Sequence, residues 1–188
     1  MDYNAITLIK EVSVPYMKNM FKGLDSSFFK IGKGIINLHI KDRFKGCSYA
    51  DMINNALGTN INYVYMKSSV SLNHIGQSSS MIAWFAHFDG EYRRSGADGC
   101  YTNIFVNENK IIERCNIEDA DEYIKKRSSC PPIRLVFQRD PDFTGNNCLC
   151  EFKGAFHCDS VKIYKKGTRL IGESVLTRFE DVEEFLHE

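Results

Sequence analysis

Strand-like segments separated by turn residues fill most of the chain, and this repeated pattern restricts the folds that it can adopt. Residues 35–40 alternate loosely, as a strand does. Segments rich in aromatic and β-branched residues recur at 62–67, 81–88, 101–106, 110–114, 133–139, 148–156, 161–164 and 169–175. Such residues favour strands. Short polar turns between neighbouring segments are typical of hairpins. The pattern predicts a twisted, mostly antiparallel sheet or a partly closed β-barrel.

Three other stretches predict helices around this sheet. Ser48 can cap a helix over residues 48–57, and Gly58 can end it. Residues 117–127 place acidic side chains before basic ones, which is the order that the helix dipole favours. The apolar spacing of residues 1–24 also indicates a helix. The expected fold class is therefore α+β.

Length and composition fit a folded protein with one main core. The chain has 188 residues, of which 43% are hydrophobic. We expect a helical N-terminal segment over residues 1–60, packed on a β-rich core domain over residues 61–188. No apolar run approaches the roughly 18 residues that a membrane helix needs, and the first residues do not resemble a signal peptide. A cytoplasmic location is therefore expected, without membrane partners.

Seven cysteines, an odd number without regular spacing, indicate free thiols in a reducing compartment. Cys148, Cys150, His157 and Cys158 lie close together in the sequence, but they form no CxxC pair. Neighbouring residues on a strand also point to opposite faces. We interpret these side chains as small buried residues of a hairpin and predict no metal site.

The balance of charges excludes some functions and leaves others open. The formal net charge is zero, which argues against a protein that grips long stretches of phosphate backbone. A local basic face remains compatible with it. No phosphate-binding loop of the Walker type and no GxGxxG fingerprint occurs in the sequence. Nucleotide hydrolysis and dinucleotide redox chemistry are not indicated.

An aromatic run within residues 76–105 holds the only tryptophan, Trp84. Aromatic side chains can sandwich an extruded base while polar groups read its edge and basic groups bind phosphates. The predicted DNA-binding residues are Tyr65, Lys67, Ser68, Ser69, Trp84, His87, Asp89, Arg93, Arg94 and Tyr101. The alternative is an ordinary sheet core, in which Trp84 and His87 would lie on opposite faces of one strand.

A second pattern resembles the PD-(D/E)xK signature of nucleases. Asp142 and Glu151 could hold Mg²⁺, while Lys153 orients the attacking water. The simpler interpretation makes Asp142 a turn residue and Glu151 and Lys153 the exposed positions of an alternating strand. We favour no catalytic residues, and Mg²⁺ enters as a cofactor only under this nuclease alternative.

Two resemblances to known families bear on these patterns. Gly76-Gln77, the run from Ala83 to Asp89, and the strand after Gly99 resemble the DNA-reading N-terminal domain of McrB-type modified-cytosine restriction proteins. Residues 133–156 are similar to the paired strands of SRA and other PUA-like domains, through Phe152-Lys153-Gly154-Ala155-Phe156. Both resemblances imply a curved β-structure that recognises a modified base.

The predicted function is that of a DNA-binding module that recognises modified or flipped bases within a restriction or phage-defence system. Its expected partner is double-stranded DNA, methylated or not, together with a partner nuclease or NTPase, and no cofactor. The first alternative is the Mg²⁺-dependent nuclease. The second is a protein-binding inhibitor encoded by a phage or mobile element, which the neutral net charge also suits.

Overall fold

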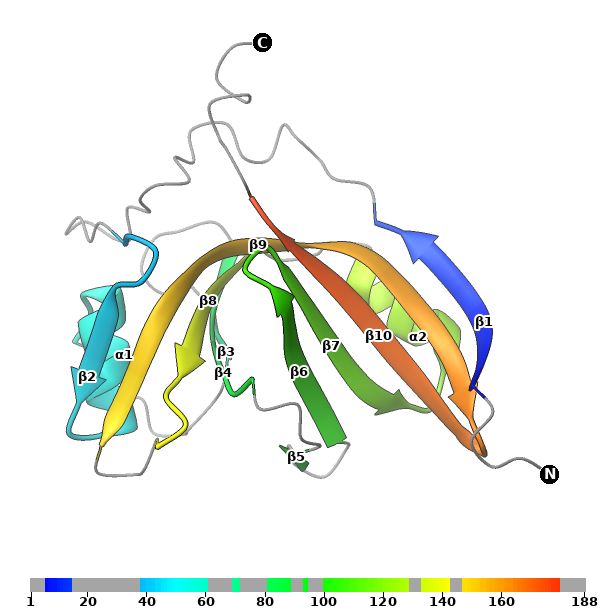
Figure 1. The fold of residues 1–188 in the computed structure, drawn as a ribbon, viewed down its shortest axis with the longest axis horizontal. Coiled ribbons are helices and arrows are strands. Elements are labelled where there is room, and N and C mark those ends of the chain that lie inside the picture. The colour runs from blue at the N-terminus through cyan, green and yellow to red at the C-terminus, as the bar shows by residue number, and fades with distance from the viewer. Residues whose placement is uncertain are drawn as a thin grey trace, which may run out of the picture. The chain divides into compact units, whose positions relative to one another are not determined.

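The structure is a computed structural model that describes residues 6–14, 38–60, 69–71, 81–88, 93–94, 100–128, 133–142 and 147–179. Most of these residues lie in strands (Figure 1). The described strands are β1 (Ile6–Ser13), β2 (Arg43–Gly46), β3 (Ser69–Ser71), β4 (Met81–Ala86), β5 (Arg93–Arg94), β6 (Cys100–Asn107), β7 (Lys110–Ile117), β8 (Ile133–Arg139), β9 (Cys148–Lys166) and β10 (Arg169–Arg178). The described helices are α1 (Tyr49–Leu57) and α2 (Ala120–Ser128).

The strands form one mixed, twisted sheet, so the predicted α+β class is confirmed. Their order is β3-β4-β8-β9-β10-β7-β6-β5, and β1 and β2 also pair with β9. β4 and β8 are parallel, from Met81↔Ile133 to Ala86↔Gln138. The other described pairings with a printed register are antiparallel. In the described part of the chain, no helix is both long and apolar enough to cross a membrane.

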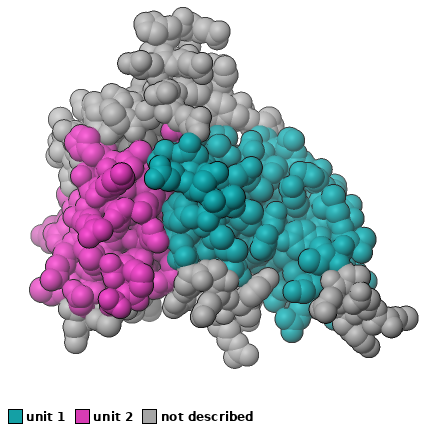
Figure 2. All heavy atoms as spheres, in the orientation of Figure 1, with its two compact units in different colours: residues 1–16, 88–131, 157–178 teal, residues 17–87, 132–156, 179–188 magenta. Residues whose placement is uncertain are grey.

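The chain divides into two compact units that are interleaved in the sequence (Figure 2). Unit 1 consists of Met1–Tyr16, Phe88–Pro131 and His157–Arg178. Unit 2 consists of Met17–His87, Pro132–Phe156 and Phe179–Glu188. The long strand β9 therefore contributes its first half to unit 2 and its second half to unit 1.

Unit 2 packs α1 against one face of its strands. Phe85 and Phe137 stack with their ring centroids 4.6 Å apart, and Phe152 lies 5.1 Å from Phe137. The Tyr49 ring at the start of α1 meets Phe85 edge-on. All three phenylalanines are fully buried. This aromatic cluster forms the part of the core of unit 2 that lies on the α1 side of the sheet.

The predicted limits of α1 are confirmed. The hydroxyl of Ser48 accepts a hydrogen bond from the backbone N–H of Asp51 at 3.1 Å. Gly58 ends the helix in the left-handed conformation, with φ of 59°. A residue with a side chain adopts this conformation at a cost, so glycine suits the position. The helix predicted over residues 117–127 is also present, as α2.

Unit 1 packs α2 against a face that carries buried polar groups. Arg127 of α2 forms an ion pair with Glu113 of β7, with 3.0 Å between Nη2 and Oε2. The hydroxyl of Tyr123 lies 2.9 Å from that of Ser174 on β10. Burial is the main reason that the pKa of Tyr123 is raised. The contact between α2 and the sheet thus depends on paired polar groups as well as on apolar area.

The helix predicted over residues 1–24 is wrong for the part that the structure describes. Ile6–Ser13 is the strand β1, which pairs with β9 from Ile6↔Lys166 to Ser13↔Ser160. Ile6, Leu8 and Ile9 are each more than half exposed. Pairing with a strand that is distant in the sequence therefore outweighed the local apolar spacing.

Two other strand predictions need correction, and one lies outside the described residues. Residues 148–156 and 161–164 were expected as separate strands, whereas β9 runs unbroken through both. Residues 38–40, expected at the end of a strand over 35–40, lead into a turn, and the strand β2 begins only at Arg43. The strand predicted over residues 62–67 lies outside the described part of the chain.

Lys41 adopts a left-handed backbone conformation, with φ of 79°. It is the third residue of a turn that the hydrogen bond from Asp42 N–H to His39 C=O closes at 3.0 Å. Such turns favour glycine at this position, because a side chain there is strained. We expect Lys41→Gly to leave the free energy of unfolding unchanged or raise it by up to about 1 kcal/mol. Urea denaturation measures this.

The matched control is Lys45→Gly, which removes the same side chain from an extended strand position. Glycine in a strand interior costs about 0.5 to 1 kcal/mol, so this variant should be less stable than the original chain. Equal destabilisation by the two substitutions would contradict the expected strain at Lys41.

Candidate nucleic-acid interface

A row of side chains crosses four neighbouring strands of unit 2. Ala86 of β4 is the register partner of Gln138 on β8, Gln138 of Glu151 on β9, and Glu151 of Arg43 on β2. Register partners project from the same face of a sheet. Because Phe85 and Phe137 project toward α1, this row lies on the face that α1 does not cover.

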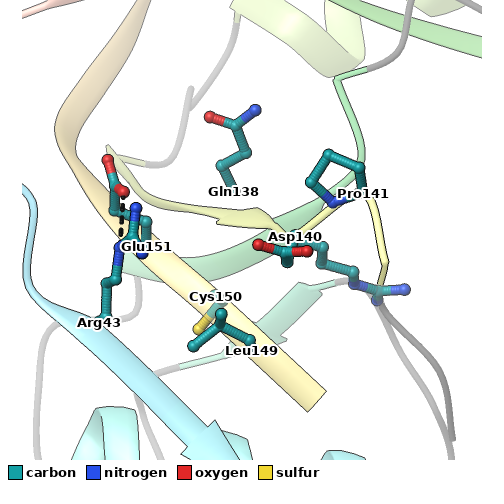
Figure 3. A pocket seen from close by; sticks show the side chains of 8 residues that line it. Arg43, Gln138, Asp140, Pro141, Leu149, Cys150 and Glu151 are labelled. Carbon is teal, nitrogen blue, oxygen red and sulfur yellow. Dashed lines mark hydrogen bonds and ion pairs between the residues drawn. The ribbon is translucent and has the colours of Figure 1, made fainter. Parts of the chain in front are cut away.

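A polar pocket of about 160 Å³ lies along this row. Figure 3 shows Arg43, Gln138, Asp140 and Glu151 around it, with Pro141 and Leu149 adding apolar surface. Its complete lining is Arg43, Gln138, Arg139, Asp140, Pro141, Leu149, Cys150 and Glu151. The pocket therefore combines guanidinium, carboxamide and carboxylate groups beside an apolar wall.

The turn between β8 and β9 shapes one end of this pocket. The backbone N–H of Asp140 donates to the C=O of Leu149 at 3.0 Å. A carboxylate oxygen of Asp140, Oδ1, accepts the N–H of Asp142 at 2.9 Å. Aspartate often stabilises turns through such local bonds. Asp140 is thus held against the pocket by the turn that it helps to form.

Both carboxylate oxygens of Glu151 interact with cationic groups. Arg43 Nε lies 3.2 Å from Oε2, and Lys153 Nζ lies 2.5 Å from Oε1. Burial alone would raise the pKa of Glu151, but the bonds and charges of Lys153 and Arg43 outweigh burial and lower it. The carboxylate is therefore ionised at neutral pH, and it pairs with Arg43, which lines the pocket, and with Lys153, which does not.

The pairing of β8 and β9 is irregular at Lys153. Val136 faces Gly154, whereas the next residue, Phe137, faces Phe152. Lys153 has no register partner on β8, as expected for a β-bulge. Gly154 has φ of 114°, a conformation that side chains rarely adopt. Bulges bend a strand and redirect side chains, and this one accompanies the bond from Lys153 back to Glu151.

Lys41, Arg43 and Lys45 are exposed on the outer face of β2 and the turn before it, and we call them the basic row. They alternate with less exposed residues, as a strand with one covered face requires. In the part of the chain that the structure describes, no carboxylate forms an ion pair with Lys41 or Lys45. The basic row therefore presents positive charge directly beside the pocket.

Trp84 lies in the core of unit 2. Its side chain is 4% exposed, and the guanidinium carbon of Arg134 lies 4.8 Å from the ring centroid. Ser69 of β3 is its register partner on one side, and Val136 of β8 on the other. Val136 and Gln138 are two residues apart on β8, so their side chains project from the same face. Trp84, the register partner of Val136, therefore shares its sheet face with the polar pocket.

His87 lies toward the other face, with Arg139. Arg139 Nη1 is 3.3 Å from His87 Nε2, and Nη2 donates to the hydroxyl of Tyr49 at 2.7 Å. The predicted separation of Trp84 and His87 onto opposite faces is therefore observed. Arg139 thus links His87 to Tyr49, the first residue of α1.

The remaining predicted DNA-binding residues belong to unit 1 or lie outside the described residues. Arg93 and Arg94 form β5 in unit 1, where Arg93 faces Tyr101. Tyr65, Lys67, Ser68 and Asp89 lie outside the described residues. The assignment of these side chains to DNA binding stays a prediction.

The three residues of the nuclease pattern have different surroundings. Asp142 is exposed in the turn, and Asp140 lines the pocket in its place, whereas Glu151 and Lys153 are bonded to each other. Among the described residues, no group of three or more histidine, cysteine, aspartate or glutamate side chains is arranged to hold a metal ion.

Burial raises the pKa of Cys150 to about 12, so its thiol stays protonated.

Sequence reasoning missed the basic row and the pocket residues Gln138 and Asp140. Part of the signal was visible, because lysine and arginine alternate with other residues from Lys41 to Lys45. Alternation of this kind predicts one charged strand face. The sequence does not show that β2 pairs with β9 and so brings Arg43 beside Glu151. In the sequence, 107 residues lie between these two positions.

Comparison with known proteins gives limited information. No protein-family model matches the sequence, and no curated protein sequence matches it. The chain is similar to one solved structure described as "The 5-Hydroxymethylcytosine-Specific Restriction Enzyme AbaSI". It has a TM-score of 0.48 and 15% sequence identity, over 73% of this chain and 38% of that one. The chain thus matches well under half of the length of that protein.

Proposed function

We propose that the chain binds double-stranded DNA through unit 2 and places a modified or flipped base in the polar pocket, as a module of a restriction or phage-defence system. The observation that carries this proposal is the basic row beside a pocket lined by Arg43, Gln138, Asp140 and Glu151. Phosphate contacts position a protein on DNA, and contacts to base edges specify the sequence. The basic row would contact the phosphates, and the pocket would contact the base.

The chemistry of the pocket suits the polar edge of a base. Arginine, glutamine and carboxylate side chains are the groups that hydrogen-bond base edges. Leu149 and Pro141 offer apolar surface to the ring. The volume of about 160 Å³ leaves room for one ring system rather than for a whole nucleoside. A base held there would have left the duplex stack, which costs least when it is modified or mismatched.

The charges predict weak, salt-sensitive binding. Lys41 and Lys45 have no described ion-pair partner, whereas Arg43 shares Glu151 with Lys153. Two or three phosphate contacts give a slope of about −2 to −3 for the logarithm of the binding constant against that of the salt concentration. The zero net charge of the chain agrees with so few contacts.

Substitutions in the basic row and in the pocket should have different effects on binding. We expect Lys45→Gln to weaken binding to every duplex and reduce the salt slope by about 1, since it removes a phosphate contact. Gln138→Ala should change the affinity ratio between duplexes by about tenfold, since it removes a group that contacts the base. Fluorescence anisotropy measures both, with labelled duplexes that carry one cytosine, 5-methylcytosine or 5-hydroxymethylcytosine.

The matched control is Lys166→Gln, an equal change of charge at an exposed position at the far end of β9, in unit 1. It should leave the affinity unchanged. If Lys45→Gln and Lys166→Gln have equal effects, the basic row is not the interface. If no duplex binds at low salt, the proposed function is wrong.

Nuclease chemistry is the second candidate, because the pocket holds two carboxylates and a lysine lies beside one of them. Asp140 and Glu151 both line the pocket and could hold Mg²⁺ there, with Lys153 near the attacked phosphate. A cation would have to compete with Arg43 and Lys153 for Glu151, so we rank binding first. Cleavage of a duplex in Mg²⁺ that Glu151→Ala abolishes would support the nuclease. Intact DNA in Mg²⁺ or Mn²⁺ would exclude it.

A further inference from the structure

A second and larger depression lies beside α1 in unit 2, and we call it the α1 groove. Its volume is about 560 Å³. It is lined by Lys45, Gly46, Cys47, Asp51, Asn54, Asn55, Thr59 and Asn60. These residues come from the end of β2, from α1 and from the segment after it. The groove is therefore built by neighbouring parts of the chain within one unit.

Side chains with both donors and acceptors dominate this groove. Asn54, Asn55 and Asn60 supply carboxamides, and Thr59 supplies a hydroxyl. The hydroxyl of Thr59 donates to Asn54 Oδ1 at 2.7 Å. The Asn55 amide donates to the C=O of Lys45 at 2.6 Å, which ties α1 to β2. Groups of this kind bind sugar and phosphate oxygens without regard to base sequence.

Lys45 connects the groove to the polar pocket. It lines the α1 groove, and Arg43, two residues earlier on the same exposed face of β2, lines the pocket. Two residues of a strand span about 7 Å. Successive phosphates of one DNA strand are about 3.4 Å apart along the helix axis. The spacing of Arg43 and Lys45 along β2 therefore corresponds to about two nucleotides of one DNA strand.

The charge of the groove is mixed. Asp51 is the one carboxylate that lines it, at the first turn of α1, where an acidic side chain is stabilised by the helix dipole. Lys45 lies at the β2 end of the lining and carries the opposite charge. A phosphate is therefore expected at the Lys45 end, with sugar oxygens toward the carboxamides.

We propose that the α1 groove holds the sugar-phosphate backbone of the nucleotides that flank the base in the polar pocket. This inference rests on the proposed function, and it adds a second contact surface with a different task. The pocket would select the base, whereas the groove would add affinity that does not depend on sequence.

The rate at which the Cys47 thiol is modified can show whether the groove is occupied. Cys47 has no role in the proposed contact with DNA. It is exposed and lines the groove, whereas Cys115, Cys148, Cys150 and Cys158 are buried. A chain with Cys100→Ser and Cys130→Ser leaves Cys47 as the accessible thiol. N-ethylmaleimide is added to this variant with and without a saturating duplex, after anisotropy has shown that the duplex binds. We expect bound duplex to slow the modification of Cys47 at least about tenfold, because it covers the groove.

A charge substitution gives an independent readout. In Asn54→Asp, an oxygen still accepts the hydroxyl of Thr59, but the new charge repels phosphate, so every duplex should bind about tenfold more weakly with unchanged base preference. The matched control is Asn107→Asp in unit 1, where an oxygen likewise still accepts the N–H of Asn109. It should leave the affinity unchanged.

The outcomes separate the two proposals. A duplex that binds but leaves the rate at Cys47 and the affinity of Asn54→Asp unchanged would overturn the α1 groove and leave the proposed function intact. Absence of binding to any duplex would overturn both. Slower modification of Cys47 together with weaker binding by Asn54→Asp supports the groove as the path of the backbone.

Discussion

Replacing Arg127 with alanine is expected to lower the free energy of unfolding by about 3 to 5 kcal/mol. Arg127 and its partner Glu113 are 18% and 8% exposed, and their charged atoms are 3.0 Å apart. Burial opposes the charge of Arg127, but the Glu113 carboxylate, together with Tyr123, Cys115 and Cys158, outweighs burial and raises the pKa of the arginine. The variant leaves the buried carboxylate without this guanidinium, and it also removes the cation that packs over the Tyr123 ring. Urea denaturation at neutral pH measures the loss.

The matched control is Lys10→Ala, which breaks the exposed ion pair between Lys10 and Asp121. Exposed pairs contribute about 1 kcal/mol or less, because water screens both charges. A double variant, Glu113→Leu with Arg127→Met, should recover much of the loss, since it removes both buried charges at once. A loss from Arg127→Ala no larger than that from Lys10→Ala would contradict the expected role of the pair.

Substituting Gly46 by alanine is expected to cost about 3 kcal/mol, at the upper end of what overpacking usually costs. A Cβ atom at Gly46 would lie 2.2 Å from the backbone nitrogen of Met52 and 2.7 Å from the carbonyl oxygen of Ser48. Backbone atoms of a helix cannot rotate away as a flexible side chain can. β2 and α1 must therefore separate, which loosens the contacts of Met52 in the core of unit 2. Thermal unfolding followed by circular dichroism measures the loss.

Two comparisons identify the cause of this loss. Gly172→Ala would place its Cβ 2.6 Å from the ring of Tyr123, and we expect a smaller cost because a ring can shift slightly. Lys45→Ala, next to Gly46 but exposed, should change stability by less than about 0.5 kcal/mol. It should still weaken DNA binding. If Gly46→Ala were as stable as Lys45→Ala, the close approach of β2 to α1 would not be a constraint.

The parts of the fold that short-range interactions decide could be predicted from the sequence. Ser48 and Gly58 mark the ends of α1, because capping depends on residues within one turn of the helix. The hairpin of β6 and β7 follows from two strand-like runs around a polar turn. The strand predicted over residues 133–139 is observed as β8, with the same limits.

The site required contacts that no local pattern describes. Ala86, Gln138, Glu151 and Arg43 come from four strands, and only the register of those strands places them in one row. The burial of Trp84 against Arg134 likewise depends on the pairing of β4 with β8. An aromatic run shows that two faces exist, but not which face α1 covers. The role of Asp140 was not predicted, because only the folded turn decides that Asp140 and not Asp142 lines the pocket.

The sequence by itself determined the α+β class and the caps of α1, because each depends on residues a few positions apart. Only the tertiary structure decided that Ile6–Ser13 is a strand, that Glu113 is paired with Arg127, and that Arg43 meets Glu151 at a pocket. The physical reason is that strand pairing and burial join residues far apart in the chain. Their free energies outweigh local preferences and leave no periodic signal in the sequence.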